Sequence, residues 1–267
     1  MLNPNAQAVL QSLSITPGDM DVLRGVRVLG VGCGTQADTL MARLTVVRVE
    51  HGRRIFPCSE ADGRTFYIVL EGRIAILGRG YVRCRVVDVL GPGDTFGDMT
   101  LLDPGGPSWH AVALTSTRLA AIPVEDLMAW ITGDPDRARG ALRSFAGRVR
   151  LSHEHLTRRF LVDVPHRLAG ALLDMAGRFG EPADEGTVVR HGLTQEQLAG
   201  LVGSSREAVN RSLARFVRRG WIGLGNRAIV LRDQRALERY VTAAGSALPR
   251  GRNASDAHVV GWNRAGD

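Results

Sequence analysis

Apolar residues recur at helical spacing through residues 193–217, LTQEQLAGLVGSSREAVNRSLARFV, in two segments separated by a glycine and two serines. Thr194 and Gln197 have the spacing of a capping box, so a first helix is expected to begin at Gln195. Three apolar residues share one face of this helix: Leu198, Leu201 and Val202. Gly203 supplies the left-handed backbone on which the helix can end.

The second segment predicts a helix over residues 206–219, capped by Ser204 or Ser205. The residues at core spacing are Val209, Leu213, Phe216 and Val217. The opposite face, expected to lie in solvent, carries Arg206, Glu207, Asn210 and Arg211. These four side chains are candidates for reading base edges.

The positions of Ala199, Gly203 and Val209 match a helix-turn-helix, in which a small residue allows a close crossing and a glycine makes the turn. The guanidinium of Arg206 suits the two major-groove acceptors of guanine, and Glu207 can accept from the amino group of cytosine. The alternative is a solvated helix pair, in which Glu207 and Arg211 form only an intrahelical ion pair.

Between residues 44 and 123 the apolar period changes to that of β-strands. The runs expected to form strands are residues 44–49, 53–56, 65–77, 81–90 and 110–123. Glycines separate these runs at short intervals, which is typical of an antiparallel barrel or sandwich. We therefore expect an α+β protein whose N-terminal part is an antiparallel barrel or sandwich.

Helical periods return after residue 123, with helices expected over residues 124–131, 135–161 and 164–179, and a loop over 180–192. Asp163 is expected to cap the helix that begins at Val164. Residues 221–231 predict a hairpin wing turning at Gly225-Asn226, and Asp233 is expected to cap a last helix that ends near Val241.

In the long helix, alternating steps of three and four residues link Leu142, Phe145, Val149, Ser152 and Leu156. This stripe predicts a seam for a parallel coiled-coil homodimer, and the alternative is that it packs on the protein's own β-rich domain. The expected domains are an N-terminal mobile arm (1–43), a β-rich domain (44–134), a dimerisation helix with hinge (135–162), a winged helix-turn-helix (163–242) and a disordered tail (243–267).

Charge supports a nucleic-acid partner. The formal net charge is +7, and all 34 basic residues are arginine. Between residues 206 and 219 there are five arginines and one acidic residue, Glu207, which is a basic stripe along the expected recognition helix. Three scattered cysteines predict neither a disulfide framework nor a metal cassette, and no export or membrane segment is evident, so we expect a cytoplasmic protein.

The run GSSREAVNRSL resembles the recognition helix of the Crp/Fnr superfamily of bacterial transcription regulators. The resemblance extends from about Leu44 to Leu231. It implies that Arg206, Glu207 and Arg211 read a TGTGA-type half-site, with Asn210 beside them on the same face. It also implies phosphate contacts from Thr194, Gln195 and Ser205. Arg227 is expected to touch a phosphate from the wing.

The segment FYIVLEGRIAIL and the later VLGPGDTFGDMTLLD resemble the β-roll of cyclic-nucleotide-binding domains. This resemblance implies that residues 44–134 form an antiparallel sensor β-roll. The candidate effector pocket therefore comprises Gly97, Asp98, Met99, Ser108, Ser152 and His153. Family members that bind cyclic AMP have a Gly-Glu-Leu step and, about ten residues later, an arginine for the phosphate. Here Gly97-Asp98-Met99 stands at that step, and no arginine occurs between Arg85 and Arg118. We therefore expect a degenerate phosphate-binding cassette and weak binding of cyclic AMP.

These observations predict a homodimeric regulator that binds palindromic double-stranded DNA, with RNA polymerase as a further partner if it activates transcription. No cofactor is assigned, and a cyclic nucleotide is the ligand class that the resemblance implies. The alternative is an effector-independent DNA-binding regulator with a vestigial sensor. Neither a catalytic constellation nor a metal site is evident, so an enzyme is not expected.

Overall fold

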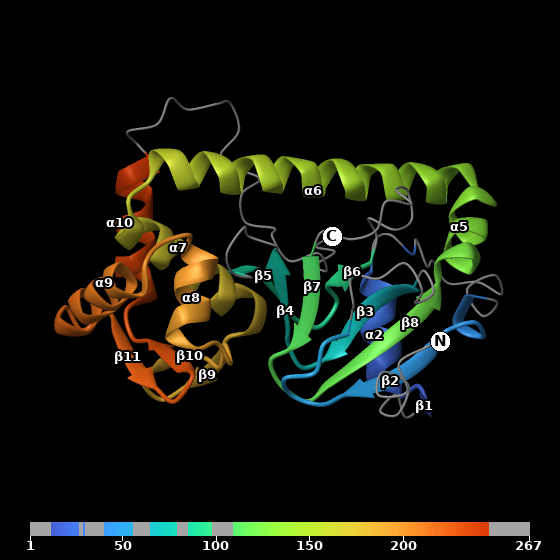
Figure 1. Cartoon of the computed structure of the whole chain (residues 1–267), viewed down its shortest axis with the longest axis horizontal. Coiled ribbons are helices and arrows are strands. Elements are labelled where there is room, and N and C mark those ends of the chain that lie inside the picture. The colour runs from blue at the N-terminus through green and yellow to red at the C-terminus, as the bar shows by residue number, and fades with distance from the viewer. Residues whose placement is uncertain are drawn as a thin grey trace. The chain divides into compact units, whose positions relative to one another are not determined.

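The computed structural model describes residues 12–26, 29, 40–55, 65–78, 85–97 and 109–245. The chain divides into two compact units, the first formed mostly by residues before 150 and the second mostly by residues 150–261. The first is rich in strands, and the second contains a set of shorter helices and a small sheet (Figure 1). The α+β class expected from the sequence is confirmed.

Two sheets form the β-rich unit. The larger has the order β1 (Ser12–Leu13), β2 (Thr45–Val49), β8 (Thr117–Pro123), β3 (Thr65–Glu71) and β6 (Thr95–Phe96). The smaller has the order β5 (Arg85–Leu90), β4 (Ile74–Gly78) and β7 (Trp109–Ala113). The central β8 pairs antiparallel with both β2 and β3, and β4 pairs antiparallel with β7.

Strand β3 explains how the sheets share their apolar residues. Successive side chains of a strand point to opposite faces. Phe66 and Ile68 accordingly enter one buried cluster, whereas Val69 enters a second cluster together with Ile74 and Phe96. Because β3 is covered on both faces, its sequence is a nearly continuous apolar run. The runs expected over residues 65–77 and 110–123 are each divided into two strands that belong to different sheets.

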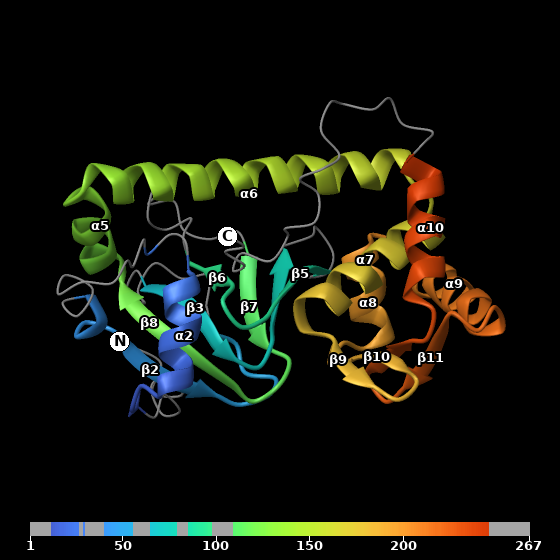
Figure 2. The ribbon, with the colours of Figure 1, turned by 180° about the vertical axis from the view of Figure 1, so that it is seen from behind.

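The N-terminal region departs from the mobile arm that the sequence predicts. Residues 12–26 form β1 and the helix α2 (Pro17–Gly25), which lies against the strands in both views (Figure 2). Leu23 is fully buried in the cluster that also contains Phe66 and Ile68. The helix begins with a capping box between Thr16 and Asp19, a signal present in the sequence but not used in the prediction.

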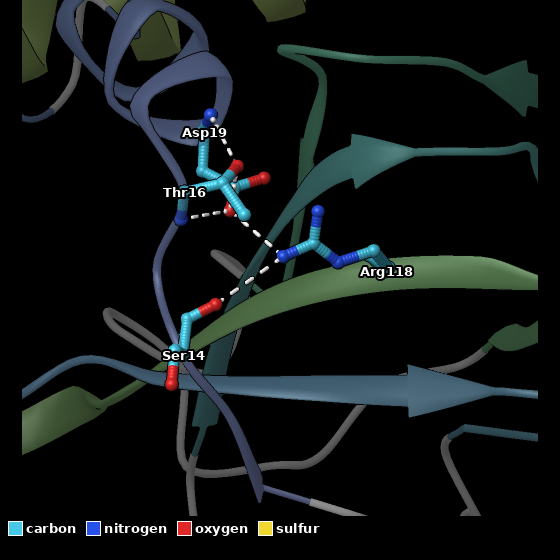
Figure 3. A network of polar contacts seen from close by, with 4 residues as sticks. All are labelled: Ser14, Thr16, Asp19 and Arg118. Carbon is cyan, nitrogen blue, oxygen red and sulfur yellow. Dashed lines mark hydrogen bonds and ion pairs between the residues drawn. The ribbon is translucent and has the colours of Figure 1, made fainter.

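Asp19 also joins α2 to the larger sheet. Its Oδ2 atom accepts from the backbone nitrogen and the hydroxyl of Thr16, each at 2.7 Å, and from Nη2 of Arg118 on β8 at 2.8 Å (Figure 3). The same Arg118 nitrogen reaches the Ser14 carbonyl oxygen at 3.4 Å. Burial alone would raise the pKa of Asp19, but the Thr16 hydrogen bonds and the Arg118 charge outweigh it and lower that pKa below 3.8.

We expect Asp19→Ala to lower the free energy of unfolding of the β-rich unit by roughly 3 kcal/mol at neutral pH, because it leaves the Arg118 charge without its partner. A lowered pKa in the folded state means that this contribution is present above the ordinary pKa and is lost as the pH falls below 3.8. Thermal melting from pH 7 to pH 2 measures both effects. Asp21→Ala, which removes an exposed carboxylate of the same helix, is the matched control; equal losses in the two variants contradict the prediction.

Two helices follow β8: α5 (Val124–Thr132) and α6 (Pro135–Leu161). The bounds of α6 are those that the sequence predicted. Ala141 of α6 is buried in the cluster that contains Phe66, and Phe145 packs against that cluster. No helix within the described residues combines the length and the apolar character needed to span a membrane.

The second unit contains α7 (Val164–Phe179), α8 (Gln195–Val202), α9 (Arg206–Arg218) and α10 (Gln234–Gly245). Its sheet has the order β11 (Ile222–Gly225), β12 (Ala228–Leu231), β10 (Gly186–Val189) and β9 (Glu181–Ala183). The loop expected over residues 180–192 is therefore wrong, since it contains the hairpin of β9 and β10. The last helix extends to residue 245, past the expected start of the tail, and residues 246–267 lie outside the described part of the chain.

Arg167 of α7 connects the three segments that set the orientation of α8. Its guanidinium donates to the carbonyl oxygens of Val162, before α7, of Val202 at 3.0 Å and of Gly203 at 3.3 Å. The carbonyl groups of Val202 and Gly203 lie at the C-terminal end of α8, where the helix supplies no N–H donors for them. One side chain therefore holds the end of α8 and the following turn against α7.

We expect Arg167→Met to lower the free energy of unfolding of the second unit by roughly 3 kcal/mol, because charge-assisted hydrogen bonds contribute about 1.5–3 kcal/mol each and their loss is partly offset by solvent. Chemical denaturation followed by circular dichroism measures this change. The matched control is Arg239→Met on α10, whose side chain is exposed. A difference below about 0.5 kcal/mol between the two variants contradicts this role for Arg167.

Candidate nucleic-acid interface

The turn between α8 and α9 follows the local signals in the sequence. Thr194 accepts from the backbone nitrogen of Gln197 at 3.2 Å, and the Gln197 side chain accepts from the Thr194 nitrogen at 2.8 Å. Gly203 ends α8 with φ +69°, in the left-handed region. Ser205, one of the two serines considered, caps α9 by accepting from the nitrogen of Ala208. The helix-turn-helix expected here is confirmed.

The inner face of α9 holds three of the four predicted residues. Val209 and Phe216 are fully buried and Leu213 nearly so, whereas Val217 is 40% exposed, so the prediction for Val217 is wrong. At 3.6 residues per turn, Val217 lies about 80° around the helix from Val209. Phe216 occupies the inward position of that last turn and contacts the rings of Trp221 and Tyr240.

The outer face of α9 presents Arg206, Glu207 and Arg211, all exposed. The pKa of Glu207 is lowered by hydrogen bonds from its own backbone nitrogen and from Ser205, and by the positive charges of Arg206 and Arg211. Glu207 is therefore ionised at neutral pH and can only accept hydrogen bonds, which is the property needed to contact an amino group such as that of cytosine.

Gln195 joins the two helices at this face. Its Oε1 atom accepts from Nε of Arg206 at 3.3 Å and from Nδ2 of Asn210 at 3.2 Å. Asn210 is half-buried, so the structure places it between the helices rather than fully on the outer face where the sequence put it. Residues 11 and 15 positions apart make these contacts, and no local pattern in the sequence indicates them.

The arginines of α9 differ from many others in how their charge is balanced. Elsewhere, carboxylates form ion pairs with several arginines, among them Arg118, Arg178, Arg190 and Arg232. Within the described ranges, no arginine of α9 forms an ion pair with a carboxylate. Arg215 instead lies over the ring of Tyr240, and Arg219, just after the helix, lies over Trp221. The helix therefore carries four arginines against one carboxylate, Glu207, and its net charge is positive.

The wing predicted over residues 221–231 is confirmed as the hairpin of β11 and β12. Gly225 pairs with Ala228, so the turn consists of Asn226 and Arg227 rather than Gly225-Asn226. Arg227 is exposed and has φ +51°, and its carbonyl oxygen accepts from the Gly192 nitrogen at 3.2 Å. The turn thus places an arginine at the tip of the wing.

The candidate effector pocket is described only in part, because Asp98, Met99 and Ser108 lie outside the described residues. Gly97 has φ +89°, and a Cβ atom there would lie 2.5 Å from the carbonyl oxygen of Thr65, so only glycine fits this corner. Ser152 and His153 are exposed on α6. A glycine requirement at Gly97 agrees with the resemblance of this segment to cyclic-nucleotide-binding domains.

A cation that the sequence analysis did not identify reaches this region from α6. Nη2 of Arg148 donates to the carbonyl oxygen of Thr95 on β6 at 2.8 Å, and Thr95 lies two residues before Gly97. Burial of the guanidinium lowers the pKa of Arg148 to about 10, an effect that the charges of Asp88 and Asp94 oppose. Arg148 is therefore ionised at neutral pH, on the side of α6 that faces the strands.

Comparison with known proteins extends these observations. Residues 46–134 match the family described as cyclic nucleotide-binding domain, and residues 166–240 match the Crp-like helix-turn-helix domain. A CRP-like cAMP-activated global transcriptional regulator of Mycobacterium tuberculosis is 35% identical over 75% of this chain and 89% of its own length.

A second relative is the cyclic AMP receptor protein of Thermus thermophilus, which is 33% identical over 66% of this chain and 79% of its own length. Among solved structures, FixK2 from Bradyrhizobium japonicum has the same fold, with a TM-score of 0.63, 22% identity and coverage of 73% of this chain and 96% of that one. The regulator expected from the sequence, rather than an enzyme, is confirmed. The chain belongs to the Crp/Fnr family of DNA-binding transcription regulators and carries a cyclic nucleotide-binding domain and a Crp-like helix-turn-helix domain.

Proposed function

We propose that this regulator binds palindromic operators as a homodimer and reads each half-site with the N-terminal half of α9. The observation that supports this most directly is the outer face of α9, where exposed Arg206 and Arg211 form no ion pair with a carboxylate within the described residues. The helix carries four arginines against one carboxylate, Glu207, and this net positive charge attracts a polyanion, which releases its counterions on binding. Double-stranded DNA fits both the charge and the shape of such a helix.

The base contacts follow from the chemistry of the exposed side chains. Arg206 offers two parallel N–H donors for the O6 and N7 acceptors of guanine, and Arg211 lies further along the same face. Glu207 accepts from the cytosine amino group. Phosphate contacts are proposed for Thr194, Ser205 and Arg227, which lie at two helix starts and at the tip of the wing; these contacts position the protein without reading sequence.

Dimerisation is proposed to use the exposed face of α6. Leu142 and Val149, seven residues apart, are 67% and 56% exposed, which is unusual for side chains of this size and matches a coiled-coil repeat. Phe145, expected in the same seam, packs instead on the protein's own core. The packing alternative therefore applies to Phe145, and the seam proposed here centres on Leu142 and Val149, with the exposed Ser152 next along it.

We expect the double substitution Leu142→Glu and Val149→Glu to dissociate the dimer, because it places like charges opposite one another in a desolvated seam. Sedimentation equilibrium at micromolar concentration measures the mass. Leu224→Glu, on an equally exposed apolar residue of the wing, is the control and is expected to leave the dimer intact. A double variant with the mass of the unsubstituted protein contradicts the proposed seam.

We expect Arg206→Ala to weaken binding to a TGTGA-N6-TCACA duplex by roughly tenfold to a hundredfold, because a bidentate contact to guanine contributes about 1–3 kcal/mol of discrimination. Fluorescence anisotropy at fixed salt, with a scrambled duplex in parallel, measures affinity and discrimination together. Arg24→Ala, on an exposed arginine of the β-rich unit, is the control. Equal affinity of the unsubstituted protein for both duplexes contradicts the proposed function.

The sensor is proposed to differ from that of cyclic AMP regulators. The two relatives described above are named for cyclic AMP, whereas this chain has Gly97-Asp98-Met99 and no arginine between Arg85 and Arg118. A missing charge-assisted phosphate contact costs roughly 2 kcal/mol, which weakens binding well over tenfold. The degenerate cassette also supports a second candidate, a regulator that binds DNA without an effector. If the regulator activates transcription, RNA polymerase is the further partner.

We expect isothermal titration with cyclic AMP to show no binding at micromolar concentrations, because the cassette lacks its arginine. The same titration with a Crp/Fnr regulator that has the complete cassette provides the positive control. A dissociation constant in the micromolar range or below contradicts the degenerate cassette. A gel shift with and without added nucleotide then separates an effector-dependent regulator from an effector-independent one.

A further inference from the structure

The side-chain carbonyl of Gln195 is shared between two residues of the recognition helix. Arg206 and Asn210 are four residues apart, so they lie one above the other on the same face of α9. Oε1 of Gln195 lies within 3.3 Å of Nε of Arg206 and within 3.2 Å of Nδ2 of Asn210. One acceptor on α8 therefore restrains two consecutive turns of α9.

For Arg206, the contact uses the donor that is least useful for reading a base. The guanidinium is planar, so a hydrogen bond at Nε restricts the plane of the whole group while both Nη nitrogens remain available. Those two nitrogens are the fork that matches guanine O6 and N7. A long arginine side chain in solvent otherwise loses rotamer freedom when it binds, and prior restraint reduces that loss.

For Asn210, the contact argues against base reading. Asparagine reads adenine with both ends of its amide, donating from Nδ2 to one base atom while Oδ1 accepts from another. Here Nδ2 donates to Gln195, and Oδ1 is buried without a hydrogen-bond partner in the structure. A buried acceptor without a donor is unfavourable, and the hydrogen bond from Nδ2 to Gln195 is the contact that offsets this cost. The amide is therefore held in its orientation by Gln195.

We propose that Gln195 and Asn210 are positioning residues, with Asn210 holding Gln195 and Gln195 holding the guanidinium of Arg206 toward the base edge. This inference rests on the proposed function, in which Arg206 reads guanine. It assigns to Gln195 and Asn210 a role in specificity that acts through Arg206. Neither residue contacts the base that it helps to select.

The test is a double-mutant cycle measured by fluorescence anisotropy on the TGTGA-N6-TCACA duplex, on single base-pair substitutions within it and on a scrambled duplex. The position that Arg206 reads is the one at which Arg206→Ala no longer discriminates. Gln195→Met removes the acceptor at similar length and is expected to lose about tenfold in affinity for the operator and discrimination at that same position. Its affinity for the scrambled duplex is expected to stay unchanged.

The cycle separates positioning from independent contacts. In the Arg206→Ala background, Gln195→Met is expected to cause no further loss, whereas in the Arg211→Ala background it keeps its full effect of about tenfold. Gln195→Glu retains an acceptor and is expected to preserve discrimination while losing affinity equally for every duplex, since its charge repels phosphate. Asn210→Ala is expected to relax discrimination at the position read by Arg206 and at no other.

Gln234→Met on α10 is the matched control, and thermal melting verifies that each variant is folded. If Gln195→Met fails to fold, Gln195→Glu and Asn210→Ala carry the test. Equal losses on the operator and the scrambled duplex after Gln195→Met identify Gln195 as a phosphate contact and overturn the proposal. Multiplicative effects with Arg206→Ala, or lost discrimination at a different base after Asn210→Ala, also overturn it. Equal binding of the unsubstituted protein to both duplexes instead contradicts the proposed function.

Discussion

The angle between α8 and α9 is the constraint on which the DNA-binding unit depends, and it is fixed by backbone groups at the end of α8. Gly203 adopts a left-handed conformation that allows the chain to turn within three residues. The carbonyl groups left open there by the helix accept from Arg167 of α7. A cation at a helix C-terminus also interacts favourably with the helix dipole. The turn is therefore held by backbone conformation, hydrogen bonding and charge at one place.

Because that turn is fixed, the side chains at the N-terminal half of α9 start from defined positions. Ser205 caps the helix, and Gln195 reaches across from the start of α8 to Arg206. Buried Val209 and Phe216 hold the other side of α9 against the unit. Rigid elements of this kind present functional groups more accurately than loops do. The positive face of α9 is thus built on a rigid scaffold.

The sequence predicts what is local in this protein. The capping box at Thr194, the glycine turn, the bounds of α6 and the start of α7 depend on residues within a few positions of one another, and the structure has each of them. The hairpin of β9 and β10 was missed because Gly, Pro and acidic residues dominate residues 180–192, and its strands depend on pairing with β12. Strand formation there is decided by tertiary context rather than by propensity.

Contacts between distant residues explain the other differences. The sequence predicts a mobile arm where α2 lies, because the few apolar residues around Leu23 give little periodicity. The attachment of this helix includes the contact of Asp19 with Arg118, 99 residues away. The exposure of Val217 follows from the preceding Phe216, which takes the inward position because Trp221 and Tyr240 surround it. The partition of the α6 stripe, with Phe145 inward and Leu142 outward, likewise required knowing where the β-rich core lies.

Helix α6 meets two requirements on faces about 100° apart, since Ala141 and Leu142, like Arg148 and Val149, are consecutive residues of the helix. On one face Ala141 is buried and Arg148 donates to the Thr95 carbonyl, while on the other Leu142 and Val149 are exposed. Separating α6 from β6 would leave an ionised guanidinium without the acceptor that balances its desolvation, and such a loss is costly. The Arg148 hydrogen bond therefore opposes a displacement of β6 unless α6 moves with it. If α6 moves as a rigid helix, the exposed Leu142 and Val149 move with it. The same backbone thus links the strand before Gly97 to the surface proposed to meet a second copy of the chain.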